Sequence, residues 1–160
     1  MHEELQRFLQ DPDEMLSNTC KYGIRALTYI ASRQSGKKMI GIKQISEDLK
    51  MPLPFLAKIL QQLAKNKILN STKGPHGGFS FKKDPAKVTL YDIILIIDGD
   101  SFFENCVIHN RNCRSAGEEN LLCPIHDEFS VIRDSITTLF KSKTIYDLVV
   151  SAEESDEVML

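Results

Sequence analysis

The 160-residue sequence contains no tryptophan, only four cysteines and no long apolar run. Its longest aliphatic run, from Ile93 to Ile97, is far shorter than the roughly 20 residues that a membrane-spanning helix needs. The amino terminus lacks the basic start and the apolar core of a secretory signal. We therefore expect a cytoplasmic protein with no membrane partner, whose cysteines are reduced thiols, metal ligands or redox groups rather than a disulfide framework.

Signatures of common enzyme sites are also missing. The glycine-rich stretch from Lys73 to Gly78 has neither the GxGxxG nor the GxxxxGK[ST] spacing of nucleotide-binding loops. No recognisable nucleophile, base and orienting acid stand together in the sequence. We therefore expect a binding protein and no enzymatic activity.

Charge is distributed unevenly along the chain, although the net charge is only −2. Residues 15–90 carry 14 basic and three acidic side chains, a net charge of +11, whereas residues 1–14 carry −4 and residues 91–160 carry −9. A basic segment joined to an acidic one predicts a polyanionic partner for the first segment only. The alternative is a solvated lysine surface, which is common on any single helix but less so for such a split.

Hydrophobic periodicity predicts two short helices separated by Lys50-Met51-Pro52. The first carries Ile42, Ile45 and Leu49 at helical spacing, and the second carries a longer apolar face made of Phe55, Leu56, Ile59, Leu60 and Leu63. Two strand-like segments then flank a glycine-rich tip at residues 73–78. This order is that of a winged helix-turn-helix, which lays its second helix in a DNA major groove.

The segment from Ile45-Ser46 to Gly99, with Lys73-Gly74-Pro75-His76-Gly77-Gly78-Phe79 at its tip, resembles the Rrf2 family of bacterial transcription regulators. The similarity extends from about Leu16 to about Leu148. It implies a mainly α fold with a small β wing (α+β), in which a winged helix-turn-helix DNA-binding domain is joined to a long dimerisation helix. The expected organisation is an acidic extension at 1–14, the winged domain at 15–99, a cysteine-containing loop at 100–123, dimerisation and short C-terminal helices at 124–150, and an acidic, disordered tail at 151–160.

Candidate DNA contacts are the residues of the second helix that remain once its apolar face is removed, together with two residues at the hairpin tip. They are Pro54, Ala57, Lys58, Gln61, Gln62, Lys65, Lys73 and His76. The resemblance implies that Pro54, Ala57 and Lys58 occupy base-reading positions. Because Pro54 and Ala57 offer no side-chain donor or acceptor, Lys58 is expected to be the one strong reader, unless it grips phosphate instead.

Two further segments are predicted to be helical. Cys20 lies on the apolar face of a first long helix capped by Ser17 or Asn18, where a buried structural thiol is expected. Thr89-Leu90-Tyr91-Asp92 has the form of a capping box and opens the aliphatic run at 93–97. A buried strand would fit that composition, but the cap favours a buried helix.

Three cysteines and a histidine, Cys106, Cys113, Cys123 and His126, are spaced C-x6-C-x9-C-x2-H. Thiolates with an imidazole suit an iron-sulfur cluster or zinc, and His109 is an alternative fourth ligand. The resemblance implies a [2Fe-2S] or [4Fe-4S] cluster on this loop, although nine residues between the second and third cysteines depart from the family spacing. A redox disulfide switch or a loop of plain thiols are the alternatives.

An amphipathic stripe containing Phe129, Ile132, Ile136, Leu139 and Phe140 predicts a long helix after Pro124. In the family such a helix forms the dimer interface, whereas the alternative is that it folds back on its own domain. The sequence thus predicts a homodimeric repressor that binds a roughly palindromic double-stranded DNA operator and senses redox state, iron or nitric oxide. A cofactor-free regulator controlled by a partner protein or thiol oxidation, and a non-DNA metal-binding or protein-interaction module, are the alternatives.

Overall fold

The computed structural model describes residues 15–33, 38–106, 108 and 124–154. Its elements in chain order are α2 (Asn18–Arg33), α3 (Ile42–Leu49), α4 (Leu53–Lys65), β1 (Leu69–Thr72), β2 (Gly78–Phe81), the 3-10 helix η1 (Pro85–Lys87), α5 (Leu90–Ile97), α6 (Ser101–Glu104), α8 (His126–Ser142) and α9 (Ile145–Glu154). The fold is mainly helical with one small antiparallel sheet, which confirms the predicted fold class. None of the described helices combines the length and the apolar character needed to cross a bilayer.

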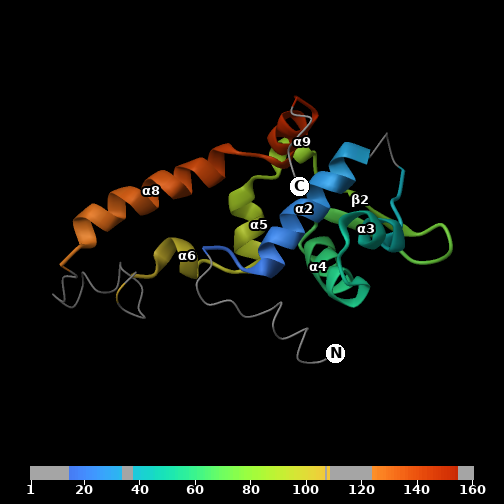
Figure 1. Cartoon of the computed structure of the whole chain (residues 1–160), viewed down its shortest axis with the longest axis horizontal. Helices are drawn as coiled ribbons and strands as arrows, with labels where there is room; N and C mark the ends of the chain where they lie inside the picture. Colours follow the sequence, from blue (N-terminus) through green and yellow to red (C-terminus); the bar gives the residue numbers. More distant parts are fainter. Residues whose placement is uncertain (1–14, 34–37, 107, 109–123, 155–160) are drawn as a thin grey trace.

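Helix α2 lies at the centre of the molecule and packs against α3, α4, α5 and α9 (Figure 1). Ser17 caps it, because its Oγ accepts the backbone N–H of Cys20 at 3.0 Å, as predicted. Where α2 crosses α5, a Cβ built on Gly23 would lie 2.5 Å from Ile97 Cδ1, so a hydrogen in place of a side chain permits the close approach. Cys20 is fully buried in this core, which confirms its predicted place on the apolar face.

The wing is a two-stranded hairpin in which Leu69 pairs with Phe81 and Thr72 pairs with Gly78. Ile40 pairs with Phe79 of β2 in an isolated antiparallel bridge. The Ile40 N–H donates to the Phe79 carbonyl, and the Ile40 carbonyl accepts from the Phe79 N–H, both at 2.9 Å. The wing is therefore held on both sides of β2 and is anchored to the segment that leads into α3.

Helix α5 has the predicted capping box. The Thr89 hydroxyl accepts the Asp92 N–H and the Asp92 carboxylate accepts the Thr89 N–H, each at 3.1 Å. The aliphatic run is thus a helix and not a strand. Thr89 also pairs with Thr144, which begins a similar cap on α9 with Asp147. The bridge between these two cap residues therefore joins α5 of the winged domain to α9.

Helix α8 extends away from the winged domain (Figure 1) and has no buried residue. It is attached at its C-terminal end, where the Phe140 ring lies 6.1 Å from Phe102 and 6.3 Å from Phe103. The following helix α9 continues to Glu154, so the expected boundary at residue 150 falls inside a helix, and residues 151–154 are not a disordered tail. The predicted arm at 1–14 and the remainder of the tail lie outside the described residues.

Candidate nucleic-acid interface

The turn between α3 and α4 is held by backbone and side-chain bonds. Lys50 takes the left-handed conformation, with φ of 53°, and its N–H donates to the Glu47 carbonyl at 3.3 Å. The Ser46 hydroxyl donates to the Met51 carbonyl at 2.6 Å, and Pro52 then opens α4. A left-handed residue other than glycine carries a conformational cost, so this conformation persists only where surrounding bonds hold it. The bonds at this turn do so, and they thereby fix the angle at which α4 leaves α3.

Helix α4 divides cleanly into a core face and an open face. Its five buried residues are those that the sequence predicted, namely Phe55, Leu56, Ile59, Leu60 and Leu63. The opposite face exposes four of the candidate contacts, Pro54, Lys58, Gln61 and Lys65, while Ala57 is half-buried between them. The structure therefore brings these five candidates together on one surface of one helix.

Gln62 differs from its expected place. It is half-buried, and its Nε2 donates to the carbonyl of Ile96 at 2.7 Å. That carbonyl belongs to the last turn of α5, where helical carbonyls lack intrahelical partners. Gln62 thus caps α5 from α4, and its amide is directed into the domain rather than toward the open face.

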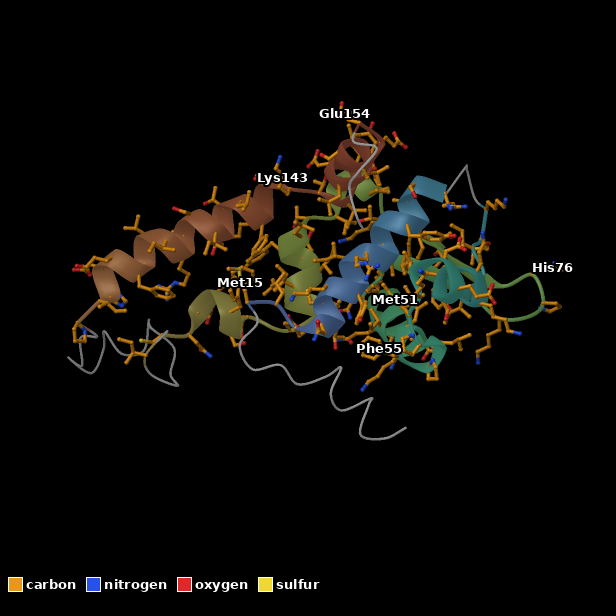
Figure 2. The ribbon with its side chains drawn as sticks, viewed as in Figure 1. Met15, Met51, Phe55, His76, Lys143 and Glu154 are labelled. Carbon is orange, nitrogen blue, oxygen red and sulfur yellow. The ribbon has the colours of Figure 1, made fainter. Side chains whose placement is uncertain are left out.

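The tip of the wing carries the remaining two candidates, Lys73 and His76, both exposed. Figure 2 shows His76 at the outermost part of the hairpin, beyond the body of the domain. The base of the tip is tightly constrained, because Gly78 has φ of 156° and a Cβ placed there would lie 2.3 Å from the Ile40 carbonyl oxygen. Only glycine fits this position without displacing the backbone.

Sequence reasoning passed over several polar residues that border this surface. Lys43 and Gln44 are exposed on α3, and Asn70, Ser71 and Thr72 are exposed along β1. The β1 residues line a cavity of about 540 Å³ together with Met39, Ser80, Phe81 and Lys82. For the β1 residues, the sequence does contain an indication of an open surface. The run Asn70-Ser71-Thr72 is polar throughout and so departs from the alternation of a half-buried strand.

Acidic side chains near the interface are engaged elsewhere. Asp48 accepts a hydrogen bond from the Tyr29 hydroxyl and lies 3.9 Å from the Arg33 guanidinium. Partial burial and this bond to Asp48 raise the pKa of the Tyr29 phenol. Asp84 caps η1 by accepting the Ala86 N–H at 3.0 Å. Two of the three acids in the basic segment thus have partners within the domain, and the lysines dominate the open face.

The predicted metal ligands fall only partly within the described residues. Cys106 is half-buried just after α6, and His126 is the first residue of α8, whereas Cys113, Cys123 and the alternative ligand His109 lie outside. Among the described residues no group of three or more His, Cys, Asp or Glu side chains is placed to hold a metal. Burial and the neighbouring Asp98 raise the pKa of the Cys20 thiol to about 12, so this fourth cysteine stays protonated at neutral pH and is a poor ligand.

Comparisons with known proteins show the family to which the chain is similar. Residues 16–151 match the Rrf2 family model, described as an iron-dependent transcriptional regulator. A protein of Aquifex aeolicus (strain VF5) named as an HTH-type transcriptional regulator is 34% identical over 136 residues, which cover 84% of this chain and 91% of the relative. The HTH-type transcriptional regulator IscR of Photorhabdus laumondii is 25% identical over 141 residues, covering 88% of this chain and 82% of IscR.

Two solved structures share the fold. CymR, the global cysteine regulator of B. subtilis, superposes with a TM-score of 0.69 at 20% identity and covers 85% of this chain and 96% of its own. T. potens IscR superposes with a TM-score of 0.62 at 21% identity, and the match covers 91% of this chain and 93% of the IscR chain. The relatives are transcriptional regulators and not enzymes, as expected for this chain. Because the family model spans most of its length, the chain belongs to the Rrf2 family of transcriptional regulators.

Proposed function

We propose that the protein is a dimeric repressor that reads a roughly palindromic DNA operator with α4 and steadies its grip with the wing. The observation that supports this most directly is the division of α4. Every large apolar side chain after Leu53 is buried, while Lys58, Gln61 and Lys65 share an open face. A bacterial regulator acts where its DNA lies, so a cytoplasmic location is part of the proposal.

Lys58 is proposed as the main base-reading residue on this face. It is exposed in the second turn of α4, and Pro54 and Ala57 beside it offer no polar side-chain atom. Ala57 contributes contact with a thymine methyl, whereas Lys58 donates to guanine acceptors. Lys65, Lys73 and His76 are assigned to the phosphate backbone and the minor groove, and Gln62 is left out because its amide is bonded to Ile96.

The test begins with selection of duplexes from a random double-stranded library by the full chain. Affinity for the selected duplex is then measured by fluorescence anisotropy across a salt series, in which phosphate contacts predict a steep fall with rising salt. Lys58→Met is expected to weaken binding about tenfold or more and to relax base preference. Lys143→Met, on an exposed lysine at the end of α8, is the matched control and is expected to leave binding unchanged. Absence of any salt-dependent duplex binding contradicts the proposal.

Dimerisation is proposed to occur through α8. Ile132 and Leu139 are 55% and 51% exposed, although both belong to the apolar stripe of a long helix. A symmetric pair of such helices covers both stripes and places two α4 helices on one side of the dimer. Two half-sites about 34 Å apart, one turn of DNA, then follow from the geometry of helix-turn-helix dimers.

Sensing is proposed to involve an iron-sulfur cluster held by Cys106, Cys113, Cys123 and His126, with zinc as the competing metal. Bound there, the cluster supplies a group that changes with redox state, iron supply or nitric oxide. The chain's own contribution is positional, because Cys106 follows α6 and His126 opens α8, so these two ligands lie on either side of the junction between the winged domain and α8. A change at these ligands thereby biases the angle between the two parts.

Anaerobic purification with iron, sulfide and zinc analysis tests the cluster. Visible absorption with matched iron and sulfide, abolished when the three cysteines are replaced by alanine, is the expected result. Colourless, metal-free protein contradicts the cluster while leaving DNA binding in place. Unchanged operator affinity of the triple variant in both redox conditions contradicts the coupling between cluster and DNA.

A further inference from the structure

A second cavity lies far from the proposed DNA face, at the junction of α5, α6 and α8. Its volume is about 300 Å³. The residues that line it come from all three helices, and they are Tyr91, Phe103, Glu104, Arg133, Asp134, Thr137 and Lys141. Figure 1 shows this junction where α8 leaves the domain beside α5, with α6 next to them. Neither the proposed operator contacts nor the proposed cluster ligands take part in it.

One wall of the cavity is aromatic and rigid. The Tyr91 ring lies 4.6 Å from Phe103, which in turn lies 6.3 Å from Phe140 of α8. Phe103 is 8% exposed, so this wall is part of the domain core. It offers a small apolar surface against which a ligand side chain can pack.

The lining also carries cationic groups that lack anionic partners within the described part of the chain. Arg133 Nη1 is shut off from solvent and has no hydrogen-bond partner. Lys141 Nζ lies 4.6 Å above the Tyr91 ring, a contact with the ring face rather than with a carboxylate. A buried guanidinium nitrogen without an acceptor is costly, and a planar carboxylate is the group that best relieves the cost. Asp134 lies on the same lining and is exposed, where it can receive an ammonium group.

The proposed dimer contact leaves this cavity open. Arg133, Thr137 and Lys141 recur every four residues and so follow one side of α8. At about 100° per residue, Leu139 lies about 120° around the helix from Arg133, and Ile132 lies about 100° away in the same direction. The exposed apolar stripe and the cavity wall are therefore different sides of α8, and a partner helix on the stripe does not fill the cavity.

We propose that this cavity binds a free α-amino acid. The carboxylate is received by Arg133 and Lys141, the ammonium by Asp134, and the side chain by the wall formed by Tyr91 and Phe103. The volume lies at the lower limit for small-molecule sites, which suits an amino acid and not a nucleotide. A ligand there contacts α5 or α6 on one side and α8 on the other, so it holds α8 at one angle to the winged domain. An effect of that angle on operator binding rests on the proposed function; the binding site does not.

The test uses the full chain and each of the twenty proteinogenic L-amino acids, first by thermal shift and then by calorimetric titration. At least one amino acid is expected to bind saturably, with acetate and methylamine binding far more weakly as the two halves of the zwitterion. Arg133→Met and Lys141→Met are expected to weaken binding at least tenfold, while Lys143→Met, just beyond the C-terminal end of the same helix, leaves it unchanged. Asp134→Asn is expected to weaken amino-acid binding without affecting acetate.

Three results overturn the proposal. The first is that no amino acid binds. The second is that binding is unchanged by both Met substitutions, at Arg133 and at Lys141. The third is that acetate binds as tightly as the best amino acid. Lys141 is exposed, so its substitution remains informative where the Arg133 variant fails to fold. Operator affinity measured on the same variants separates the two proposals, because lost amino-acid binding with intact DNA binding concerns the cavity alone.

Discussion

Helices α4 and α8 are both amphipathic, but they bury their apolar faces to very different degrees. The 13-residue α4 has five buried residues, whereas the 17-residue α8 has none. Ile132 and Leu139 of α8 remain more than half exposed, while Leu60 and Leu63 of α4 are fully covered. An isolated helix of this length is marginal in water, and the proposed dimer supplies a cover for the part of α8 that the described residues leave exposed. Among the described residues, α4 is thus covered by its own chain, whereas the apolar stripe of α8 is left exposed.

The largest expected effect comes from replacing one leucine in each helix. Leu60→Ala removes a fully buried side chain and is expected to lower the free energy of unfolding by about 2–5 kcal/mol. Leu139→Ala at the exposed position is expected to cost less than about 1 kcal/mol in dilute protein. Urea unfolding followed by circular dichroism measures both. Equal losses for the two variants contradict the contrast between the helices.

Two exposed residues on different sides of α8 test whether the exposed stripe is an interface. Ile132→Asp places a charge in the stripe and is expected to raise the dimer dissociation constant at least about tenfold, because a charge cannot be buried unpaired. Thr138→Asp is the matched control, since Thr138 is exposed but lies about 120° around α8 from Ile132 and about 160° from Ile136 of the stripe. Sedimentation equilibrium reports both constants. A chain that stays monomeric at all concentrations, or equal effects of the two variants, contradicts the interface.

The capping box of α5 supplies a smaller difference between the domain and α8. Thr89→Ala removes the hydroxyl that accepts the Asp92 N–H and is expected to cost about 1 kcal/mol of stability. Thr138→Ala, at an exposed position on α8, is expected to change stability by less than about 0.5 kcal/mol. Thermal unfolding of both variants beside the unsubstituted chain measures the difference, and a silent Thr89 variant would show that the cap does not contribute.

The smallest effect concerns pH. Since burial raises the pKa of the Cys20 thiol from 9.0 to about 12, the unfolded chain loses this proton at a lower pH than the folded chain. The stability that the protonated thiol contributes is fully present well below pH 9 and is lost progressively as pH rises toward about 12; the loss is about 0.4 kcal/mol at pH 9. The unfolding free energy is measured from pH 7 to 9 for the unsubstituted chain and for Cys20→Ala. Cys106→Ala serves as a control, and parallel profiles for the chain with and without Cys20 refute the effect.

Local sequence determined most of the winged domain and little of what surrounds it. The spacing of Phe55, Ile59 and Leu63 fixed the buried face of α4, and Thr89 with Asp92 fixed the start of α5, because both patterns act over a single helical turn or two. Six of the eight candidate DNA contacts followed from the same spacing, and five of these six lie on the less buried side of α4. The exception, Gln62, depends on a bond across 34 positions of the chain.

The sequence by itself determined the class of the fold, the helix-turn-helix, the glycine-bearing wing and the split between basic and acidic halves, since each is written in neighbouring residues. Only the tertiary structure decided that Gln62 turns inward to Ile96, and that Arg133 and Lys141 meet Tyr91 and Phe103 around one cavity. These features join residues far apart in the chain. Their positions are set by how the helices pack, which no local pattern of side chains encodes.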